Sequence, residues 1–206
     1  MRSSFKFAEN TPLLETERLI LRKLTTSADD RMAMFAILSD KDVNMFLPWF
    51  PVGNLQDTER HIREHFLNFY SLPVAYRYAI CLKENNRPIG YAGMSMDDSH
   101  DFGYGLHKEF WHKGIVQEAS AAVVERIRNN GCPYITATHD INNPRSGNVL
   151  KKLGMKYCYS YTEQWMPKNI PVTFRLYQLN FDGQRDRVFQ KYRLRCPNFI
   201  EDSDTI

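Results

Sequence analysis

The sequence has little cysteine and no paired cysteine motif. Its four cysteines, Cys81, Cys132, Cys158 and Cys196, are scattered over 206 residues, whereas structural zinc sites usually show closely spaced pairs such as CxxC. A disulfide framework is typical of much smaller secreted domains. The sequence therefore predicts neither a metal site nor disulfide bonds, and it favours a reducing, cytoplasmic setting.

Long hydrophobic runs are also missing, and neither sign of charge dominates. No apolar stretch is long enough to cross a bilayer, and the first residues lack the apolar segment of a signal peptide. The formal net charge is +3, whereas nucleic-acid-binding domains usually carry a concentrated basic patch. We therefore expect neither a membrane nor a nucleic acid as partner. The apolar content of 43% is enough for the core of one globular domain.

The order of the expected elements indicates a mixed α/β fold. The predicted strands are residues 13–24, 76–82, 88–96, 102–106, 134–139, 157–165 and 172–179, and the predicted helices are 27–38, 57–69, 115–130 and 144–153. The first helix is expected to bury Met32, Phe35, Ala36 and Leu38. Because helices and strands do not alternate strictly, we expect a mostly antiparallel central sheet flanked by helices.

Residues 1–180 are assigned to one domain, and residues 181–206 to a C-terminal extension. Between residues 184 and 195, apolar side chains recur at helical spacing among the cations Arg185, Arg187, Lys191, Arg193 and Arg195. This pattern predicts a helix docked on the domain, and a contact with an acidic partner is the alternative. Residues 201–206 are expected to fray, as chain ends often do.

A loop containing Gly114 leads into the most strongly periodic helix. The unpaired N–H groups and the positive dipole end of a helix start bind phosphate well. The GxxxxGK[ST] motif is absent, and Gly103 and Gly105 lie too far before the helix for a GxGxxG motif. The alternative is a plain strand-to-helix connection with one loop glycine.

The short helix at 144–153 begins with a second polar segment, from Asn143 to Ser146. Asn143 is a natural N-cap, Pro144 suits the first helical position, and Gly154 ends the helix. Helix capping fully accounts for the occurrence of Asn143 at this position, and it accounts only in part for that of Ser146.

Three segments in this order resemble the GNAT superfamily of acetyl-CoA-dependent N-acetyltransferases, and within it the ribosomal-protein N-terminal acetyltransferase subgroup. They are LETERLILRKL (14–24), GYGLHKEFWHKGIVQEA (103–119) and NNPRSGNVLKKLGMKY (142–157). The second resembles the signature (Arg/Gln)-x-x-Gly-x-(Gly/Ala), although Trp111 and Val116 depart from it. The third resembles Asn-x-x-Ser followed by Lys-x-Gly-Phe. The similarity extends over roughly residues 13–179.

The resemblance implies a sheet that splays in the middle and holds acetyl-CoA. By this resemblance, Tyr104, Gly105 and Leu106 line the gap, and a backbone N–H near Leu106 stabilises the oxyanion. Asn143 contacts the pantetheine arm, and Ser146 protonates the departing thiolate, because Leu150 stands where many members have a tyrosine. The residues expected at the pyrophosphate are Trp111, His112, Lys113, Gly114, Ile115, Val116 and Gln117.

The general base is less clearly marked than the cofactor loop. His139 has a suitable intrinsic pKa, and Asp140 and Glu163 are further candidates, as is a chain of water molecules. His139 as an ordinary residue at a strand end is the alternative to His139 as base.

These observations predict an acetyl-CoA-dependent N-acetyltransferase that moves the acetyl group directly to a primary amine in a ternary complex. No cysteine lies at a motif position, so no acetyl-enzyme is expected. The acceptor is a protein N-terminus or a small amine. The loop bearing Phe46, Trp49 and Phe50 shapes its pocket, unless it folds onto its own core. A non-catalytic acyl-CoA-binding regulatory domain and a nucleotide-binding interaction module are the alternatives, and a homodimer stays open.

Overall fold

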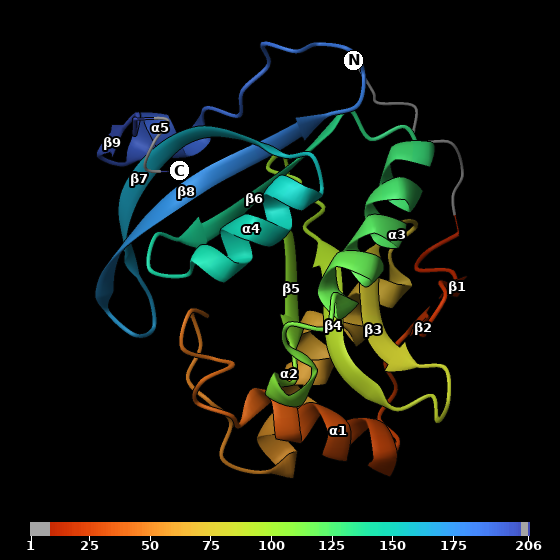
Figure 1. Cartoon of the computed structure of the whole chain (residues 1–206). Helices are drawn as coiled ribbons and strands as arrows, with labels where there is room; N and C mark the ends of the chain where they lie inside the picture. Colours follow the sequence, from red (N-terminus) through yellow and green to blue (C-terminus); the bar gives the residue numbers. More distant parts are fainter. Residues whose placement is uncertain (1–8, 203–205) are drawn as a thin grey trace. The chain divides into compact units, whose positions relative to one another are not determined.

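The computed structural model describes residues 9–202 and 206, which form two compact units. The first unit comprises the described residues of Met1–Met45, Pro51–Met94 and Tyr104–Cys132. The second comprises those of Phe46–Phe50, Ser95–Gly103 and Pro133–Ile206 (Figure 1). Each is described by itself below. The predicted mixed α/β architecture with antiparallel sheets and flanking helices is confirmed.

The sheet of the first unit has five strands in the order β1-β2-β3-β4-β5. Its strands are β1 (Leu14–Glu15), β2 (Leu19–Arg22), β3 (Tyr76–Leu82), β4 (Pro88–Met94) and β5 (Phe102–Leu106), of which Tyr104–Leu106 belong to this unit. The strands β3 and β4 form an antiparallel hairpin, with Tyr76 opposite Met94 and a register shift between Ile80 and Cys81. The order of the strands makes β5 an edge strand of this sheet.

The prediction of one strand over residues 13–24 is wrong, because the chain turns back within it. The Thr16 N–H donates to the Leu19 carbonyl at 3.0 Å, and the Leu19 N–H donates to Thr16 Oγ1 at 3.1 Å. These two bonds close a turn between β1 and β2, which pair antiparallel with Leu14 opposite Leu21.

Two helices cover part of this sheet. Ser27 caps α1 (Ala28–Leu38). The helix α2 (Leu55–His65) starts earlier than expected because Asn54 accepts a capping bond from Asp57 N–H at 2.9 Å. A 3₁₀ turn, η1 (Leu67–Ser71), follows. The predicted buried side of α1 is partly wrong: Met32 is 56% exposed, and the core residues are Ala33, Met34, Ile37 and Leu38. Ile62 and Phe66 of the α2 region belong to the same apolar cluster as Met34, Ile37 and Leu38.

A third helix of the first unit, α3 (Ile115–Asn129), follows β5 and the short turn η2 (Lys108–Phe110). Its predicted bounds are confirmed within one residue. Ile115, Ala119, Val123 and Ile127 form its buried side, in keeping with its strong apolar periodicity. The chain leaves the helix through Gly131, whose φ of +82° belongs to the left-handed region that glycine adopts readily.

The second unit contains an antiparallel sheet with four strands in the order β6-β8-β7-β9. Its elements are β6 (Tyr134–Asp140), α4 (Pro144–Lys152), β7 (Lys156–Trp165), β8 (Ile170–Asn180), α5 (Lys191–Arg195) and β9 (Asn198–Phe199). One face of this sheet carries the apolar cluster of Tyr159, Tyr161, Val172, Phe174 and Leu176. Because side chains alternate along a strand, His139, Ser160 and Arg175 share the opposite face.

The C-terminal extension differs in detail from the prediction. The helix expected over residues 184–195 is only α5, at Lys191–Arg195, and β9 was not predicted. Val188, Phe189, Tyr192 and Cys196 nevertheless pack against the apolar cluster of the second sheet. Of the tail expected to fray, Glu201 forms an ion pair with Arg175, and residues 203–205 lie outside the described part of the chain.

Two further properties of the described residues concern membranes and metals. Among the helices of residues 9–202, none combines the length and the hydropathy required to span a bilayer. The same residues hold no group of three or more His, Cys, Asp and Glu side chains arranged to bind a metal ion.

Candidate active site

The loop before α3 has the geometry of an anion-binding turn. His112 and Gly114 adopt positive φ angles of 61° and 72°, and Gly114 is the N-cap, without a side-chain hydrogen bond to the helix. The N–H groups of the first turn therefore have no side-chain cap. A residue with a Cβ would be strained at Gly114 because its backbone is left-handed.

Arg18 braces this loop from the start of β2. Its Nη1 donates to the Lys113 carbonyl at 2.9 Å, and its Nε donates to Glu118 at 2.6 Å. Thr16 Oγ1 donates to the same carboxylate at 2.5 Å. Burial raises the pKa of Glu118, but the hydrogen bonds from Thr16 and Arg18 outweigh this effect and hold the pKa below its usual range. The negative charge in the first turn of α3 is thereby paired, and the Lys113 carbonyl is turned toward Arg18.

Leu106 presents its backbone polar groups at the outer edge of the first sheet. The next residue, His107, donates its N–H to the Ile89 carbonyl of the β4 segment at 2.8 Å. N–H directions alternate along a strand, so the N–H and the carbonyl of Leu106 point away from β4. Trp111 Nε1 donates to that carbonyl at 2.9 Å. The tryptophan that departs from the resembled signature thus holds the end of β5.

Gly105 is required by the packing of β4 against β5. A Cβ built at Gly105 would lie 2.5 Å from a ring carbon of Tyr91, and one built at Gly90 would lie 2.5 Å from the Gly105 carbonyl oxygen. Tyr91 therefore occupies the space of the missing side chain. Its Oη is buried and has no hydrogen-bond partner among the described residues, and burial raises its pKa. Tyr91 was not identified from the sequence.

In the second unit, α4 places Ser146 beside its N-cap. Asn143 Oδ1 accepts from the Ser146 N–H at 3.4 Å, and Pro144 follows the cap. This confirms the capping role of Asn143. Leu150, at the position where the resemblance has a tyrosine, is 1% exposed and packs in the interior. Among these α4 residues, Ser146 offers the hydroxyl.

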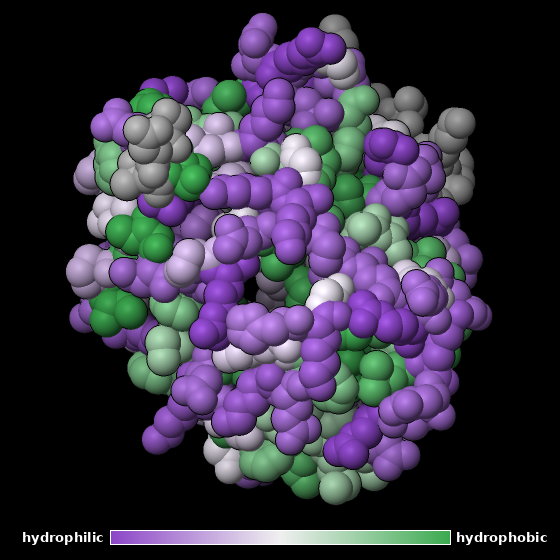
Figure 2. Space-filling view, in the orientation of Figure 1, coloured by the Kyte–Doolittle hydropathy of each residue, from purple (hydrophilic) through white to green (hydrophobic). Residues whose placement is uncertain are grey.

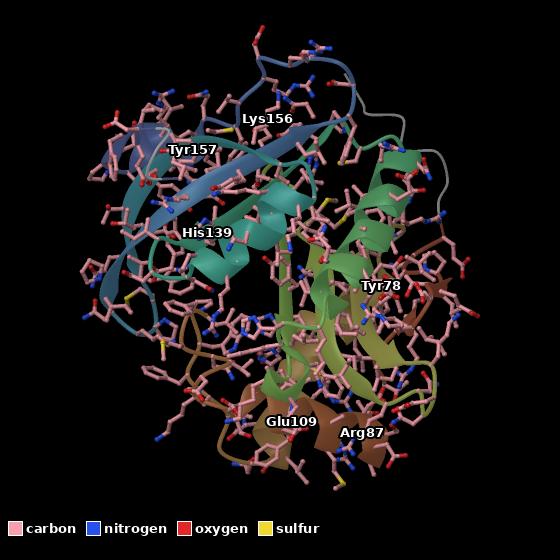
Figure 3. The ribbon with its side chains drawn as sticks, in the orientation of Figure 1. Tyr78, Arg87, Glu109, His139, Lys156 and Tyr157 are labelled. Carbon is pink, nitrogen blue, oxygen red and sulfur yellow. The ribbon has the colours of Figure 1, made fainter. Side chains whose placement is uncertain are left out.

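His139 lies under α4 at the end of β6 (Figure 3). It is 4% exposed, its Nδ1 lies 2.8 Å from the Asp140 carbonyl oxygen, and its Nε2 has no hydrogen-bond partner among the described residues. A Cβ built at Gly147 would lie only 2.7 Å from Nε2, so Gly147 makes room for the ring. Burial lowers the pKa of His139, which favours a neutral imidazole at pH 7.

The other two base candidates do not share this environment. Asp140 Oδ1 accepts from the backbone N–H and the side-chain amide of Asn142, at 2.8 and 2.9 Å, and so closes the turn before α4. Glu163 is opposite Val172, on the sheet face that carries the apolar cluster. Burial raises the pKa of Glu163. Of the three candidates, His139 is therefore the one packed against α4.

The predicted acceptor residues form a short segment of the second unit, Phe46–Phe50. Phe46 and Trp49 are half-buried, and Phe50 is 60% exposed. No helix or strand includes this segment.

The structure thus groups the predicted residues in two sets. The first unit brings together Tyr104, Gly105, Leu106 and the loop from Trp111 to Gln117, with Arg18 as an unforeseen brace. The second brings together His139, Asn143 and Ser146, with Gly147 as the unforeseen neighbour. Arg18 lies within the first resembled segment, but nothing in the sequence links it to a residue about a hundred positions later.

Comparisons with known proteins point to one family. A family model described as an acetyltransferase (GNAT) domain matches residues 18–156. The uncharacterized N-acetyltransferase YoaA of Bacillus subtilis strain 168 is 28% identical over 152 residues, which cover 70% of this chain and 83% of that protein.

Solved structures show the same fold. An acetyltransferase of the GNAT family from Bacillus anthracis has a TM-score of 0.69 at 22% identity, covering 83% of this chain and 99% of that one. The ribosomal L7/L12 alpha-N-protein acetyltransferase RimL, in complex with coenzyme A, has a TM-score of 0.70 at 15% identity, with the same shares covered, 83% and 99%.

Proposed function

The chain belongs to the GNAT acetyltransferase family, and from this premise we propose that it transfers an acetyl group from acetyl-CoA directly to a primary amine in a ternary complex. The observation that carries the proposal is the outward-facing backbone of Leu106, fixed by Trp111 and lying next to the braced loop before α3. An amine acceptor is also supported by the name of the relative YoaA, an N-acetyltransferase.

The proposed contacts with acetyl-CoA begin at the start of α3. N–H groups from His112 to Gln117 hold the pyrophosphate, with the positive end of the helix dipole behind them. Arg18 keeps the Lys113 carbonyl turned away from the anion and pairs with Glu118, which would otherwise repel it. Tyr104, Gly105 and Asn143 contact the pantetheine arm. The residues fit the cofactor because the first turn of α3 has no side-chain cap and the N–H of Leu106 points away from β4.

The proposed chemistry forms an N–C bond and breaks the thioester C–S bond. The Leu106 N–H stabilises the oxyanion that develops on the thioester oxygen. His139, neutral because burial lowers its pKa, takes a proton from the attacking amine, directly or through water. Ser146 gives a proton to the departing thiolate and recovers one from water. No step uses a covalent acetyl-enzyme.

We assign acceptor recognition to Phe46, Trp49 and Phe50, and the acceptor to a protein N-terminus or a small-molecule amine. The catalytic domain is proposed as residues 1–180, with 181–206 as an extension. A reducing, cytoplasmic setting is supported by Cys81, Cys158 and Cys196, which are free thiols.

Calorimetric titration with acetyl-CoA, with ATP as control, tests the proposal, followed by an amine screen monitored by thiol release. We expect saturable one-site binding of acetyl-CoA, none of ATP, and release of thiol with a primary amine. Binding without turnover on any amine would favour an acyl-CoA-binding regulatory domain, and a preference for ATP would contradict the assignment of the α3 loop.

A further inference from the structure

The C-terminal segment wraps around one edge of the second sheet. On the apolar face, the ring of Tyr192 stacks on Tyr161 with centroids 4.7 Å apart and planes 5° apart. The Phe189 N–H donates to Gln178 Oε1 at 2.8 Å, and Tyr159 Oη donates to the Phe189 carbonyl at 2.8 Å. These contacts fix the segment on one side of the sheet.

The segment then passes along the edge to the opposite face. In β9, Asn198 pairs with Tyr161 and Phe199 with Ser160 of β7. Two residues later, the Glu201 N–H donates to Tyr157 Oη at 3.0 Å. Tyr157 is opposite Tyr177, and Tyr177 lies on the same face of β8 as Arg175, the partner of His139. The chain end therefore reaches the face that carries His139.

Glu201 is tied to this face by a partly buried ion pair. Arg175 donates to its carboxylate from Nε at 2.9 Å and from Nη2 at 2.5 Å, and both side chains are 13% exposed. Ser160 Oγ donates to the same carboxylate. Arg175 and Ser160 hold the pKa of Glu201 below its usual range. A bidentate pair of this kind is strong and directional, and removing one partner leaves a costly unpaired charge.

Arg175 is the cross-strand neighbour of His139. The two are directly opposite in the β6–β8 register, so their side chains start about 5 Å apart on one face. Tyr177 of β8 also packs on the His139 ring, with centroids 5.5 Å apart. A guanidinium here opposes protonation of the imidazole, and a carboxylate paired with it offsets that effect.

We propose that Glu201 is a positioning residue of the active site: its carboxylate holds and neutralises Arg175, and so preserves the orientation of His139 and its capacity to bind a proton. The role of His139 as base rests on the proposed function; the coupling between Glu201 and His139 does not.

Besides Arg175 and Glu201, several other polar and charged groups lie around His139. Asp140 adjoins it on β6, and the carbonyls of Asp140 and Asn143 favour its protonated form. Tyr177 faces it from β8, and Tyr157 contacts Tyr177 at 5.9 Å between centroids. The helix α4 presents Gly147 to it, whereas the cations of α4 are exposed: Arg145, Lys151 and Lys152. Figure 2 shows a hydrophilic surface over α4.

An NMR titration of the His139 imidazole tests the coupling in the full chain. The resonance is assigned by its loss in His139→Gln. We expect Glu201→Gln, which keeps the shape but removes the charge, to weaken proton binding at His139 by about threefold or more. Glu201→Asp, which keeps the charge, should stay closer to the wild type. An unchanged titration in folded Glu201→Gln would overturn the proposal.

A double variant distinguishes the effect of the lost charge from a general effect of Glu201→Gln on folding. In Arg175→Gln with Glu201→Gln both charges are absent, so the protonation of His139 should return toward that of the wild type. A double variant that titrates like Glu201→Gln would equally overturn the coupling.

The pH dependence of kcat/KM then separates this inference from the proposed function. If His139 is the base, the acidic limb should move to lower pH in Glu201→Gln together with the NMR titration. An NMR shift without movement of that limb would support the coupling and contradict the base role.

Discussion

At the scale of single residues, Ser146 is the group proposed as the catalytic acid. A thiolate is a stable leaving group, so its protonation matters only moderately. We expect Ser146→Ala to lower kcat by about 10- to 100-fold while the Kd for acetyl-CoA measured by calorimetry stays within about twofold. Asn148→Ala, an exposed change on the same helix, serves as the control. A Ser146→Ala enzyme with wild-type kcat would remove Ser146 from the mechanism.

Gly147 offers a second test at this scale. Because a Cβ there would lie 2.7 Å from Nε2 of His139, Gly147→Ala forces the ring or the helix to shift. We expect a loss of about 1–3 kcal/mol in the free energy of unfolding and a larger fall in kcat than in acetyl-CoA affinity. Gly103→Ala is the matched control, since a Cβ at Gly103 meets nothing within 4 Å. Equal stability of the two variants in urea would contradict the argument.

Several residue roles could be read from the sequence and others could not. Asn143, Pro144 and Gly154 mark α4 by local chemistry alone, and the structure confirms them. His139 and Glu163 lie on opposite faces of the second sheet because the register shifts between Tyr157 and Tyr159. No local sequence pattern predicts this shift.

At the scale of elements, the start of α3 depends on the turn between β1 and β2. Arg18→Gln removes the charge that pairs with Glu118 and the donor to the Lys113 carbonyl. We expect the Kd for acetyl-CoA to rise about tenfold, consistent with the loss of a hydrogen bond to a charged group.

Acetyl-pantetheine, which lacks the pyrophosphate, isolates this effect. The kcat/KM for acetyl-pantetheine should be nearly unchanged in Arg18→Gln. The control Arg60→Gln, an exposed change on α2, should change the kinetic constants for neither acetyl-CoA nor acetyl-pantetheine. A parallel loss with both donors would mean that Arg18 supports the fold generally and not the phosphate loop.

The helix α2 carries a pH-dependent contribution to stability. Burial, together with the neighbouring His65, lowers the pKa of His61 to about 3. The unfolded chain binds a proton at about pH 6.5, so the unfolded state gains protons first as the pH falls. Stability is therefore full above that value and is lost progressively down to about pH 3.

We expect the free energy of unfolding to fall by about 1–2 kcal/mol more between pH 7.5 and 5 in the wild type than in His61→Gln. Urea titrations at the two pH values measure the difference, and the slope with pH is compared, not the absolute stability. Identical slopes would show that His61 is not buried in its neutral form.

Element bounds followed from the sequence where capping and periodicity agreed. The strand Tyr76–Leu82 and the start of α3 at Ile115 are as predicted. The stretch 184–195 has helical spacing, but Val188 and Phe189 pack on the sheet, and the Phe189 N–H and carbonyl bond to Gln178 and Tyr159. Tertiary contacts outweigh local periodicity there, and only Lys191–Arg195 is helical.

At the scale of the whole molecule, the residues proposed for cofactor binding, catalysis and acceptor recognition are divided between the two units. The braced loop and Leu106 belong to the first, whereas Ser146, His139 and the segment Phe46–Phe50 belong to the second. That segment is the sole part of residues 9–94 assigned to the second unit. The aromatic side chains of this segment are the ones proposed for acceptor recognition.

Trp49→Ala tests that role. We expect the KM for the amine acceptor to rise about tenfold or more, because a large aromatic contact surface is lost, while the Kd for acetyl-CoA stays unchanged. Leu72→Ala, an exposed apolar change in the first unit, is the control and should alter neither constant. Steady-state kinetics with the best amine from the screen, together with calorimetry, measure both. Equal losses in the two constants would show that Trp49 supports folding and not acceptor binding.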